Sequence, residues 1–288
     1  MEAVLPLKIS GDYQDFDLQR ARILLFSLEK FYNSGKPLIV HVIALRKEME
    51  DIKNNFLGKY NNINVIIHPE DELIQEFGSV HCWNGWMKQQ VLKLAAHKLV
   101  NSEFYLALDA DIVCFREFGV NDMIIDGRAI CDWEDRSVHT SWWENSAKII
   151  GVQPNIDDVG MKPTPAIISH KVCQELESFL FRKLGDGFWG KILDIPGWTE
   201  FTLYNLFAES IGCMSKFHYN KEEVRLIKKA LRGQHNFSTE ESFLKWNPEK
   251  CFSTDQPGYF MVCNSSSRVD PARIWEKLSV HFCCDLQP

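Results

Sequence analysis

The sequence predicts an α/β fold in which helices flank a mainly parallel sheet, built as a single domain. Three observations favour this class. Short apolar runs alternate with amphipathic helical stretches through the first half of the chain. The 288 residues, 45% apolar and 25% charged, suit one large globular domain. No internal repeat, low-complexity tract or Ser/Gly linker divides the chain.

Hydrophobic periodicity predicts each element of the first half in turn. Apolar runs of strand length lie at Val4–Ser10, Pro37–Leu45, Asn64–His68 and Phe104–Leu108. Residues with helical spacing lie between them, at Gln19–Phe31, Arg46–Phe56 and Gly85–Leu99. Strands that alternate with helices in this way form βαβ units, in which neighbouring strands run parallel.

The second half is less regular. We expect strands near Arg128–Cys131, Ala166–Ser169 and Gly258–Cys263, and helices near Trp142–Ile150, Lys171–Leu184, Thr199–Ser210, Glu222–Leu231 and Pro271–Leu278. Residues 1–115 then form a nucleotide-binding half, and residues 116–288 form a divergent half on the acceptor side.

Charge and cysteine content exclude several classes of partner. With 32 Lys and Arg against 39 Asp and Glu, the net charge is −7, so the chain offers no global positive field to nucleic acid. The start, MEAVLPLKISGDY, lacks a signal-peptide pattern, and no run approaches the roughly 18 apolar residues of a membrane span. Nine cysteines without a C-x-x-C pair fit reduced thiols. We therefore expect a soluble, cytoplasmic protein.

The most informative segment is the strand Phe104–Leu108, which ends in Asp109-Ala110-Asp111. In open α/β sheets, ligands bind outside the carboxyl ends of the strands, where these two acids fall. Two carboxylates so spaced suit one Mg²⁺ or Mn²⁺, whose other positions take water and diphosphate oxygens. The alternative is a turn whose acids face water. Asp15-Phe-Asp17 has the same spacing, but N-capping explains it.

Around this motif the chain resembles the nucleotide-sugar-dependent glycosyltransferases of the GT-A fold. The resemblance rests on the architecture of residues 4–115, on the helix segment Gly85-Trp-Met-Lys-Gln-Gln-Val-Leu-Lys93-Leu, and on Gly197-Trp-Thr-Glu200-Phe-Thr-Leu-Tyr204. It looks closest to uncharacterised bacterial glycosyltransferase-like proteins. It implies a GT-A-like, Rossmann-like sheet, with Asp109, Ala110 and Asp111 at the metal and the diphosphate of a sugar nucleotide.

The resemblance also implies donor contacts before the acidic pair. Lys93 would neutralise a diphosphate oxygen and Gln90 would bind ribose or base, although a solvated polar stripe explains both. The loop Ser10-Gly-Asp-Tyr13 would form a base pocket with Tyr13 as its stacking face. A plain βα turn explains that loop nearly as well.

Two later residues receive roles in the same way. Glu200 would be the general base that deprotonates the acceptor hydroxyl, which favours an inverting mechanism. An acid in the first turn of a helix is, however, also stabilised by the helix dipole alone. His281 would be a further metal ligand, although an ordinary terminal histidine is the simpler interpretation.

A basic stripe on the predicted helix near residues 222–231 remains outside this scheme. Arg225, Lys228, Lys229 and Arg232 follow helical spacing opposite three apolar residues. This helix would either lie on an anionic membrane surface or be a solvated surface helix. At most, therefore, the chain makes peripheral membrane contact.

These observations favour a metal-dependent glycosyltransferase, a hexosyl- or pentosyltransferase. It would move a sugar from a nucleoside-diphosphate donor to a glycan or lipid-linked hydroxyl acceptor, in surface polysaccharide or glycan synthesis. Two alternatives stay open. One is a phosphatase of the haloacid-dehalogenase type, with Asp109 as the nucleophile. The other is a sugar- or nucleotide-binding protein without turnover, since a fold does not fix a function.

Overall fold

The computed structural model describes residues 1–10, 14–78, 83–253 and 257–282. Its centre is a five-stranded sheet of order β10-β4-β1-β2-β3. The strands are β1 (Glu2–Leu7), β2 (Leu38–Ala44), β3 (Ile63–Pro69), β4 (Phe104–Ala107) and β10 (Ala166–Ser169). The first four run parallel, and β10 pairs antiparallel with β4. The middle strand β1 is buried throughout, whereas the edge strand β3 alternates between buried and exposed positions.

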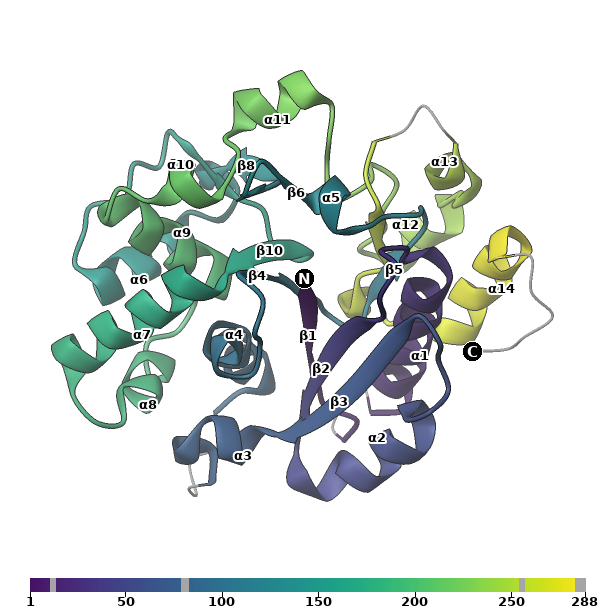
Figure 1. Cartoon of the computed structure of the whole chain (residues 1–288), viewed down its shortest axis with the longest axis horizontal. Helices are drawn as coiled ribbons and strands as arrows, with labels where there is room; N and C mark the ends of the chain where they lie inside the picture. The colour runs from purple at the N-terminus through teal and green to yellow at the C-terminus, as the bar shows by residue number, and fades with distance from the viewer. Residues whose placement is uncertain (11–13, 79–82, 254–256, 283–288) are drawn as a thin grey trace.

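Helices cover both faces of this sheet (Figure 1). The helices α1 (Gln14–Phe31) and α2 (Met49–Phe56) lie on one side, and α4 (Gly85–Ala95) lies on the other. Asn84 begins α4, because its side-chain oxygen accepts the backbone N–H of Trp86 at 2.9 Å. Short helices complete the first half: α3 (Glu70–Leu73) and the 3₁₀ turns Arg46–Glu48, Gln75–Gly78 and Ala96–Lys98.

A helical layer from the second half packs against α4 (Figure 1). It contains α6 (Thr140–Ile150), α7 (His170–Leu184), α8 (Phe188–Leu193), α9 (Glu200–Ser210) and α10 (Met214–Phe217), with the 3₁₀ turn Arg136–His139. Thr199 begins α9 by accepting the backbone N–H of Thr202. Two small strand pairs border this layer: β6 (Ile124–Ile125) with β7 (Arg128–Ala129), and β8 (Trp133–Asp135) with β9 (Val159–Met161).

The last part of the chain returns to the first half. Strand β11 (Phe260–Val262) pairs antiparallel with β5 (Ile112–Cys114), which directly follows the Asp-x-Asp motif. A second apolar core forms beside this pair, with Phe237, Phe243 and Trp246 among its buried rings. The remaining helices are α5 (Val120–Met123), α11 (Lys221–Ile227), α12 (Glu240–Lys245), α13 (Glu249–Phe252), α14 (Pro271–Phe282) and the 3₁₀ turn Ser265–Ser267.

The predicted fold class is confirmed: the sheet is mainly parallel and lies between helices in one domain. Two boundaries in the second half were wrong. The helix expected over Glu222–Leu231 ends at Ile227, because Lys228 adopts a left-handed φ of 54°. The strand expected over Arg128–Cys131 pairs only at Arg128 and Ala129. The strands β5, β8 and β9 were not predicted, since three-residue strands give too little periodicity to detect, and so the partner of the predicted strand near Gly258–Cys263 was missed.

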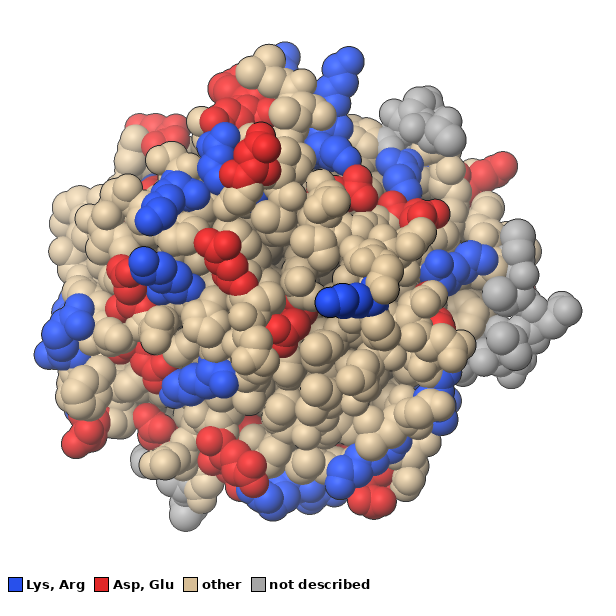
Figure 2. Space-filling view, viewed as in Figure 1, with Lys and Arg blue, Asp and Glu red and all other residues tan. Residues whose placement is uncertain are grey.

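The structure shows the surface charge, the helix lengths and the state of the cysteines. On the face shown in Figure 2, Lys and Arg side chains are interspersed with Asp and Glu, so this face has no continuous basic surface for a phosphate backbone. Within the described ranges, every helix is too short or too polar to cross a bilayer. The six cysteines described there, Cys114, Cys131, Cys173, Cys213, Cys251 and Cys263, are free thiols.

Gly258 allows a close approach of two backbone segments next to β11. Its φ is +98°, and a Cβ built there would lie 2.5 Å from the backbone nitrogen of Gly233 and 2.7 Å from the carbonyl carbon of Arg232. Backbone atoms cannot move aside as a flexible side chain can. We expect Gly258→Ala to lower the free energy of unfolding by about 2–5 kcal/mol. The loss has two sources, because alanine is unfavourable at this positive φ and its Cβ would collide with the backbone of residues 232 and 233.

Urea denaturation measures this effect, with Gly35→Ala as the matched control. Gly35 also has a positive φ, +70°, but a Cβ added there would meet nothing within 4 Å. The control should therefore lose only about 1–2 kcal/mol. Equal losses for both variants would show that the approach of residues 232 and 233 to Gly258 is not tight in solution.

Candidate active site

The Asp-x-Asp motif lies in a cavity of about 400 Å³ at the carboxyl ends of β1 and β4. Leu108 continues β4 by donating its backbone N–H to Val4 at 2.9 Å, and the chain then turns at Asp109. The position is the one expected for a ligand site in an open α/β sheet. The wall is mostly polar and includes Pro6, Leu7, Lys8, Asp17, Trp86, Gln89, Gln90, Lys93, Asp109, Ala110, Asp111, Pro163, Thr164, Arg232, Val262, Asn264, Ser265 and Ser266.

Lys93 connects three parts of the chain from its place on α4. Its side chain is only 2% exposed, and its Nζ lies 2.6 Å from Asp109 Oδ1 and 2.7 Å from Glu200 Oε1. It also donates to Thr164 Oγ1 at 3.3 Å. Burial alone lowers the pKa of Lys93, but the charges of Asp109 and Glu200 raise it above its ordinary value. The ammonium therefore stays charged and is fully occupied by protein oxygens.

This arrangement corrects the role expected for Lys93. An ammonium has three donors, and all three have partners within the protein. Lys93 lines the cavity, yet it holds Asp109 in place and is not free for a diphosphate. Gln90, one turn earlier on α4, is likewise directed into the protein. Its side chain donates to the Trp86 carbonyl at 2.9 Å and accepts the backbone N–H of Glu200 at 3.2 Å.

Glu200 lies behind the cavity wall. It is 1% exposed, and its Oε2 has no hydrogen-bond partner in the described part of the chain. Burial raises the pKa of Glu200 to about 7, while the Lys93 charge opposes that shift and the Asp109 charge adds to it. The structure thus joins Glu200 to the acidic motif through Lys93. It does not expose the carboxylate to an acceptor, as the predicted general base would require.

The buried carboxyl of Glu200 makes stability depend on pH. Below its folded pKa of about 7 the native chain keeps a proton that the unfolded chain releases near pH 4.5. Stability therefore falls as the pH rises through this window, by on the order of 3 kcal/mol. In urea titrations, the free energy of unfolding of Glu200→Gln relative to the wild type should increase from pH 5 to pH 8. A difference that stays flat would show that Glu200 is already ionised at pH 5.

The two aspartates retain capacity for a ligand. Asp109 is 31% exposed on the cavity wall and uses one oxygen for Lys93. Asp111 accepts the backbone N–H of Ser265 at 2.7 Å through Oδ2. Burial raises the pKa of Asp111, as does the charge of Asp109, while the Ser265 N–H lowers it. A carboxylate has about four lone-pair sites, so both groups still fit a divalent cation that also binds substrate oxygens.

In the described part of the chain, no third His, Cys, Asp or Glu side chain completes a metal site with this pair. The described residues contain no group of three or more His, Cys, Asp or Glu side chains that could hold a metal. His281, predicted as a further ligand, lies on α14 with its ring stacked on Phe252 at a centroid distance of 4.5 Å. It is not among the residues that line the cavity, so the structure corrects this prediction.

The loop after β1 is only partly described. Ser10 donates its hydroxyl to Glu48, which also accepts the backbone N–H of Ile9 at 2.8 Å. This contact fixes the loop and directs the Ser10 side chain away from the role expected for it. Tyr13 lies outside the described residues.

A second cavity of about 310 Å³ adjoins the first and shares Pro6, Leu7, Lys8 and Gln89 with it. Its wall adds the apolar side chains of Ile43, Leu45 and Leu92 and the indole of Trp83. Glu70 and Lys88 form an ion pair in the same wall. We call these two adjoining cavities the groove; its wall is polar around the aspartates and more apolar in the second cavity.

Arg232 lines the same cavity as the two aspartates, although the sequence analysis placed it on a surface stripe. Its guanidinium lines the cavity on the side of Asp111, and its Nε has no hydrogen-bond partner among the described residues. Burial lowers the pKa of Arg232, and the charges of Asp132, Glu134 and Asp111 oppose this shift. No ion pair to it forms in the described ranges. Helical periodicity assigned Arg232 to an exposed stripe. That assignment fails because α11 ends at Ile227, so Arg232 is not on the helix.

Comparison with known proteins supports the fold and adds a family. A search of curated proteins gave no match. The apo crystal structure of mouse xyloside xylosyltransferase 1 is similar to this chain, with a TM-score of 0.52 and 12% sequence identity. The match covers 93% of this chain and 99% of the mouse chain. At this identity the likeness shows the fold alone, which is that of a glycosyltransferase structure. One family model, of unknown function, matches residues 1–285, and the chain therefore belongs to the DUF6492 family.

Proposed function

We propose that this chain is a glycosyltransferase that moves a sugar from a nucleoside-diphosphate donor to a hydroxyl acceptor. The observation that carries the proposal is that one cavity is lined by two partly exposed aspartates and by Arg232, whose Nε has no hydrogen-bond partner among the described residues. Carboxylates suit a divalent cation and a guanidinium suits phosphate oxygens, so the cavity offers both kinds of contact to a diphosphate. The similarity to a xylosyltransferase structure agrees with this chemistry.

The shape of the groove suggests how the donor lies. The diphosphate would occupy the polar cavity, and the nucleoside would extend into the adjoining pocket beside Trp83 and Leu45. An indole face and aliphatic side chains suit a base, while the Glu70 and Lys88 pair offers polar contacts to its edge. This arrangement replaces Gln90 and Ser10 as base or ribose contacts, since both side chains are directed elsewhere.

The charged residues in and behind the polar cavity then have separate roles. Asp109 and Asp111 would hold Mn²⁺ or Mg²⁺, which when bound would neutralise charge on the departing diphosphate. Arg232 would donate to a diphosphate oxygen from the side of Asp111. Lys93 and Glu200 are positioning residues, because their buried ion pair fixes the direction of the Asp109 carboxylate. The geometry gives no support to an inverting route through Glu200, which does not line the cavity.

The test is a panel of UDP-, GDP-, ADP- and dTDP-sugars in a thermal-shift assay with and without Mn²⁺. A ligand that binds only the native chain raises its melting temperature by mass action. We expect a manganese-dependent shift with one nucleotide, lost in Arg232→Gln and kept in the exposed control Arg182→Gln. Hydrolysis or transfer of the bound sugar separates an enzyme from a binding protein. Phosphate release from an aryl phosphate would favour the phosphatase alternative.

A further inference from the structure

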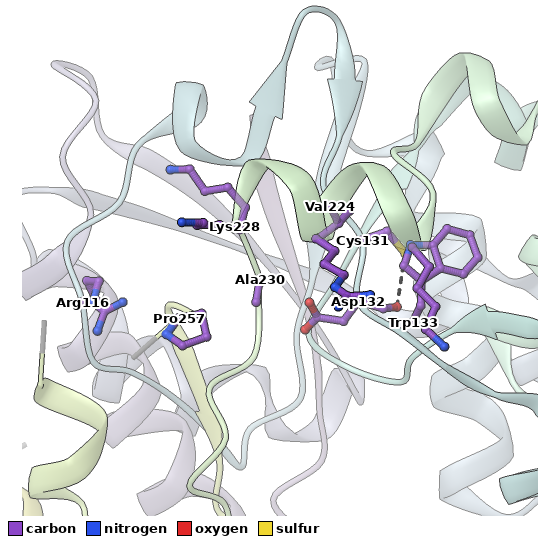
Figure 3. A pocket seen from close by; sticks show the side chains of 11 residues that line it. Arg116, Cys131, Asp132, Trp133, Val224, Lys228, Ala230 and Pro257 are labelled. Atoms are coloured by element: carbon purple, nitrogen blue, oxygen red, sulfur yellow. Dashed lines mark hydrogen bonds between the residues drawn. The ribbon is translucent and has the colours of Figure 1, made fainter. Parts of the chain in front are cut away.

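A separate cavity of about 550 Å³ lies beside α11 (Figure 3). It lies outside the groove proposed to bind the sugar donor, which we call the donor groove. Arg116 and Pro257 lie on one side of it, Asp132 and Trp133 lie on the other, and Ala230 lies between them. The wall also includes four basic residues from α11 and the segment after it, Lys221, Arg225, Lys228 and Lys229. With Arg116 and Asp132, the cavity is lined by five basic side chains and one acidic side chain.

Several of these charges already have partners. Lys221 lies 3.7 Å from Asp135, and Lys229 lies 2.9 Å from Asp122. The one lining carboxylate, Asp132, accepts the backbone N–H groups of Leu231 and Arg232 at 3.0 and 2.7 Å.

Arg116 donates to the backbone carbonyl of Ser253 at 2.7 Å, and two other cations in the wall have no carboxylate partner in the described part of the chain. Arg225 and Lys228 are exposed and form no ion pair within the described ranges. The wall holds five basic side chains against the single carboxylate of Asp132, so their charges are only partly compensated inside the cavity. The cavity therefore has a positive interior.

Lys228 is held in an unusual conformation for a side chain of its kind. It ends α11 with a φ of 54°, where glycine or asparagine would avoid the steric cost of the left-handed region. This conformation ends α11 at the wall of the cavity, which Lys228 lines.

The cavity is a neighbour of the donor groove. Ala230 lines the basic cavity and Arg232 lines the donor cavity, and two residues of chain span at most about 7 Å. Asp132 fixes this shared wall through its two backbone hydrogen bonds. The two cavities are therefore separated at this point by the backbone of residues 230–232.

We propose that this cavity binds an acceptor sugar through an anionic group, a phosphate or a carboxylate. The proposal rests on the proposed glycosyltransferase function and names the class of its acceptor. Arg225 and Lys228 would form charge-assisted hydrogen bonds to the anion, and the partly exposed indole of Trp133 offers an apolar face to the sugar ring. A volume of about 550 Å³ is in the range of small-molecule sites.

The test measures binding to the full chain by ligand-observed NMR titration. The probes are glucose 6-phosphate, glucuronate and uncharged glucose. Arg225→Gln with Lys228→Asn removes both free charges, and Asn tolerates the left-handed backbone at residue 228. Lys171→Gln with Arg182→Gln removes two exposed charges from α7 and is the matched control. Manganese-dependent UDP binding is followed in every variant as a separate readout of the donor groove.

The expected result is that an anionic sugar binds at least about tenfold more weakly to the Arg225/Lys228 variant, while the control and UDP binding are unchanged. Glucose should bind to none of them. The proposal would be overturned if the Arg225/Lys228 variant bound the anionic sugar as tightly as the control variant. It would also be overturned if neither anion bound to the wild type. If the anion binds through these residues but no nucleotide binds, the donor assignment fails and the anion site stands alone.

Anionic vesicles of phosphatidylglycerol form the last arm, because Leu226 is 80% exposed on the same helix. Binding to vesicles without binding to either sugar anion would replace the acceptor site with a membrane-facing surface.

Discussion

Replacing Asp111 with Asn should lower the rate of sugar-donor consumption about 100- to 1,000-fold, the largest effect of any single change. The neutral oxygen of an amide binds a divalent cation more weakly than the charged oxygen of a carboxylate does. Folding should be preserved, because the Asn side-chain oxygen can still accept the Ser265 N–H that Asp111 accepts at 2.7 Å. Loss of the Asp111 charge next to Asp109 also removes a repulsion.

Donor consumption by this variant is measured at saturating Mn²⁺ beside Asp186→Asn. Asp186 is exposed and lies outside both parts of the donor groove, so its variant should keep the parental rate. Unfolding in urea confirms that both proteins are folded. If Asp111→Asn consumed donor as fast as the control, the acidic pair would have no part in the reaction.

The second large effect is on stability. Lys93→Met should lower the free energy of unfolding at pH 8 by about 3–5 kcal/mol, because it leaves the buried carboxylate of Glu200 without its counter-charge. The loss should be smaller at pH 5. Without Lys93 the pKa of Glu200 rises further above about 7, so at pH 5 the carboxyl is protonated and needs no partner.

A double variant separates charge from packing. Lys93→Met combined with Glu200→Gln removes both ends of the pair, so its stability at pH 8 should exceed that of Lys93→Met alone. Urea unfolding of the four proteins forms the double-mutant cycle. A loss below about 1 kcal/mol for Lys93→Met at pH 8 would place this ion pair with ordinary surface pairs.

Sequence reasoning located the acidic pair because local pattern determines it. An apolar strand that ends in Asp109 and Asp111 is visible within eight residues, and the edge of a parallel sheet follows from topology. Lys93 and Glu200 were both selected, but their contact was not predicted. They are joined by the packing of α4 against α9, which no periodicity reports.

The errors have physical causes of the same kind. Arg232 was assigned to a helix that ends early at Lys228, since spacing alone continues the helical pattern through a left-handed residue. His281 lies on a helix that runs past its expected end to Phe282, so its ring packs against Phe252. A lone histidine carries no information about its tertiary neighbours.

The strands on either side of the acidic pair receive their partners from distant sequence. β4 pairs with β10 and β5 pairs with β11, so residues 166–169 and 260–262 complete hydrogen bonding begun by residues 104–114. A fragment cut after residue 115 would expose two unpaired strand edges and the charge of Lys93. Residues 1–115 are therefore not a module that could be shuffled between proteins, and unfolding of the sheet should be one cooperative event.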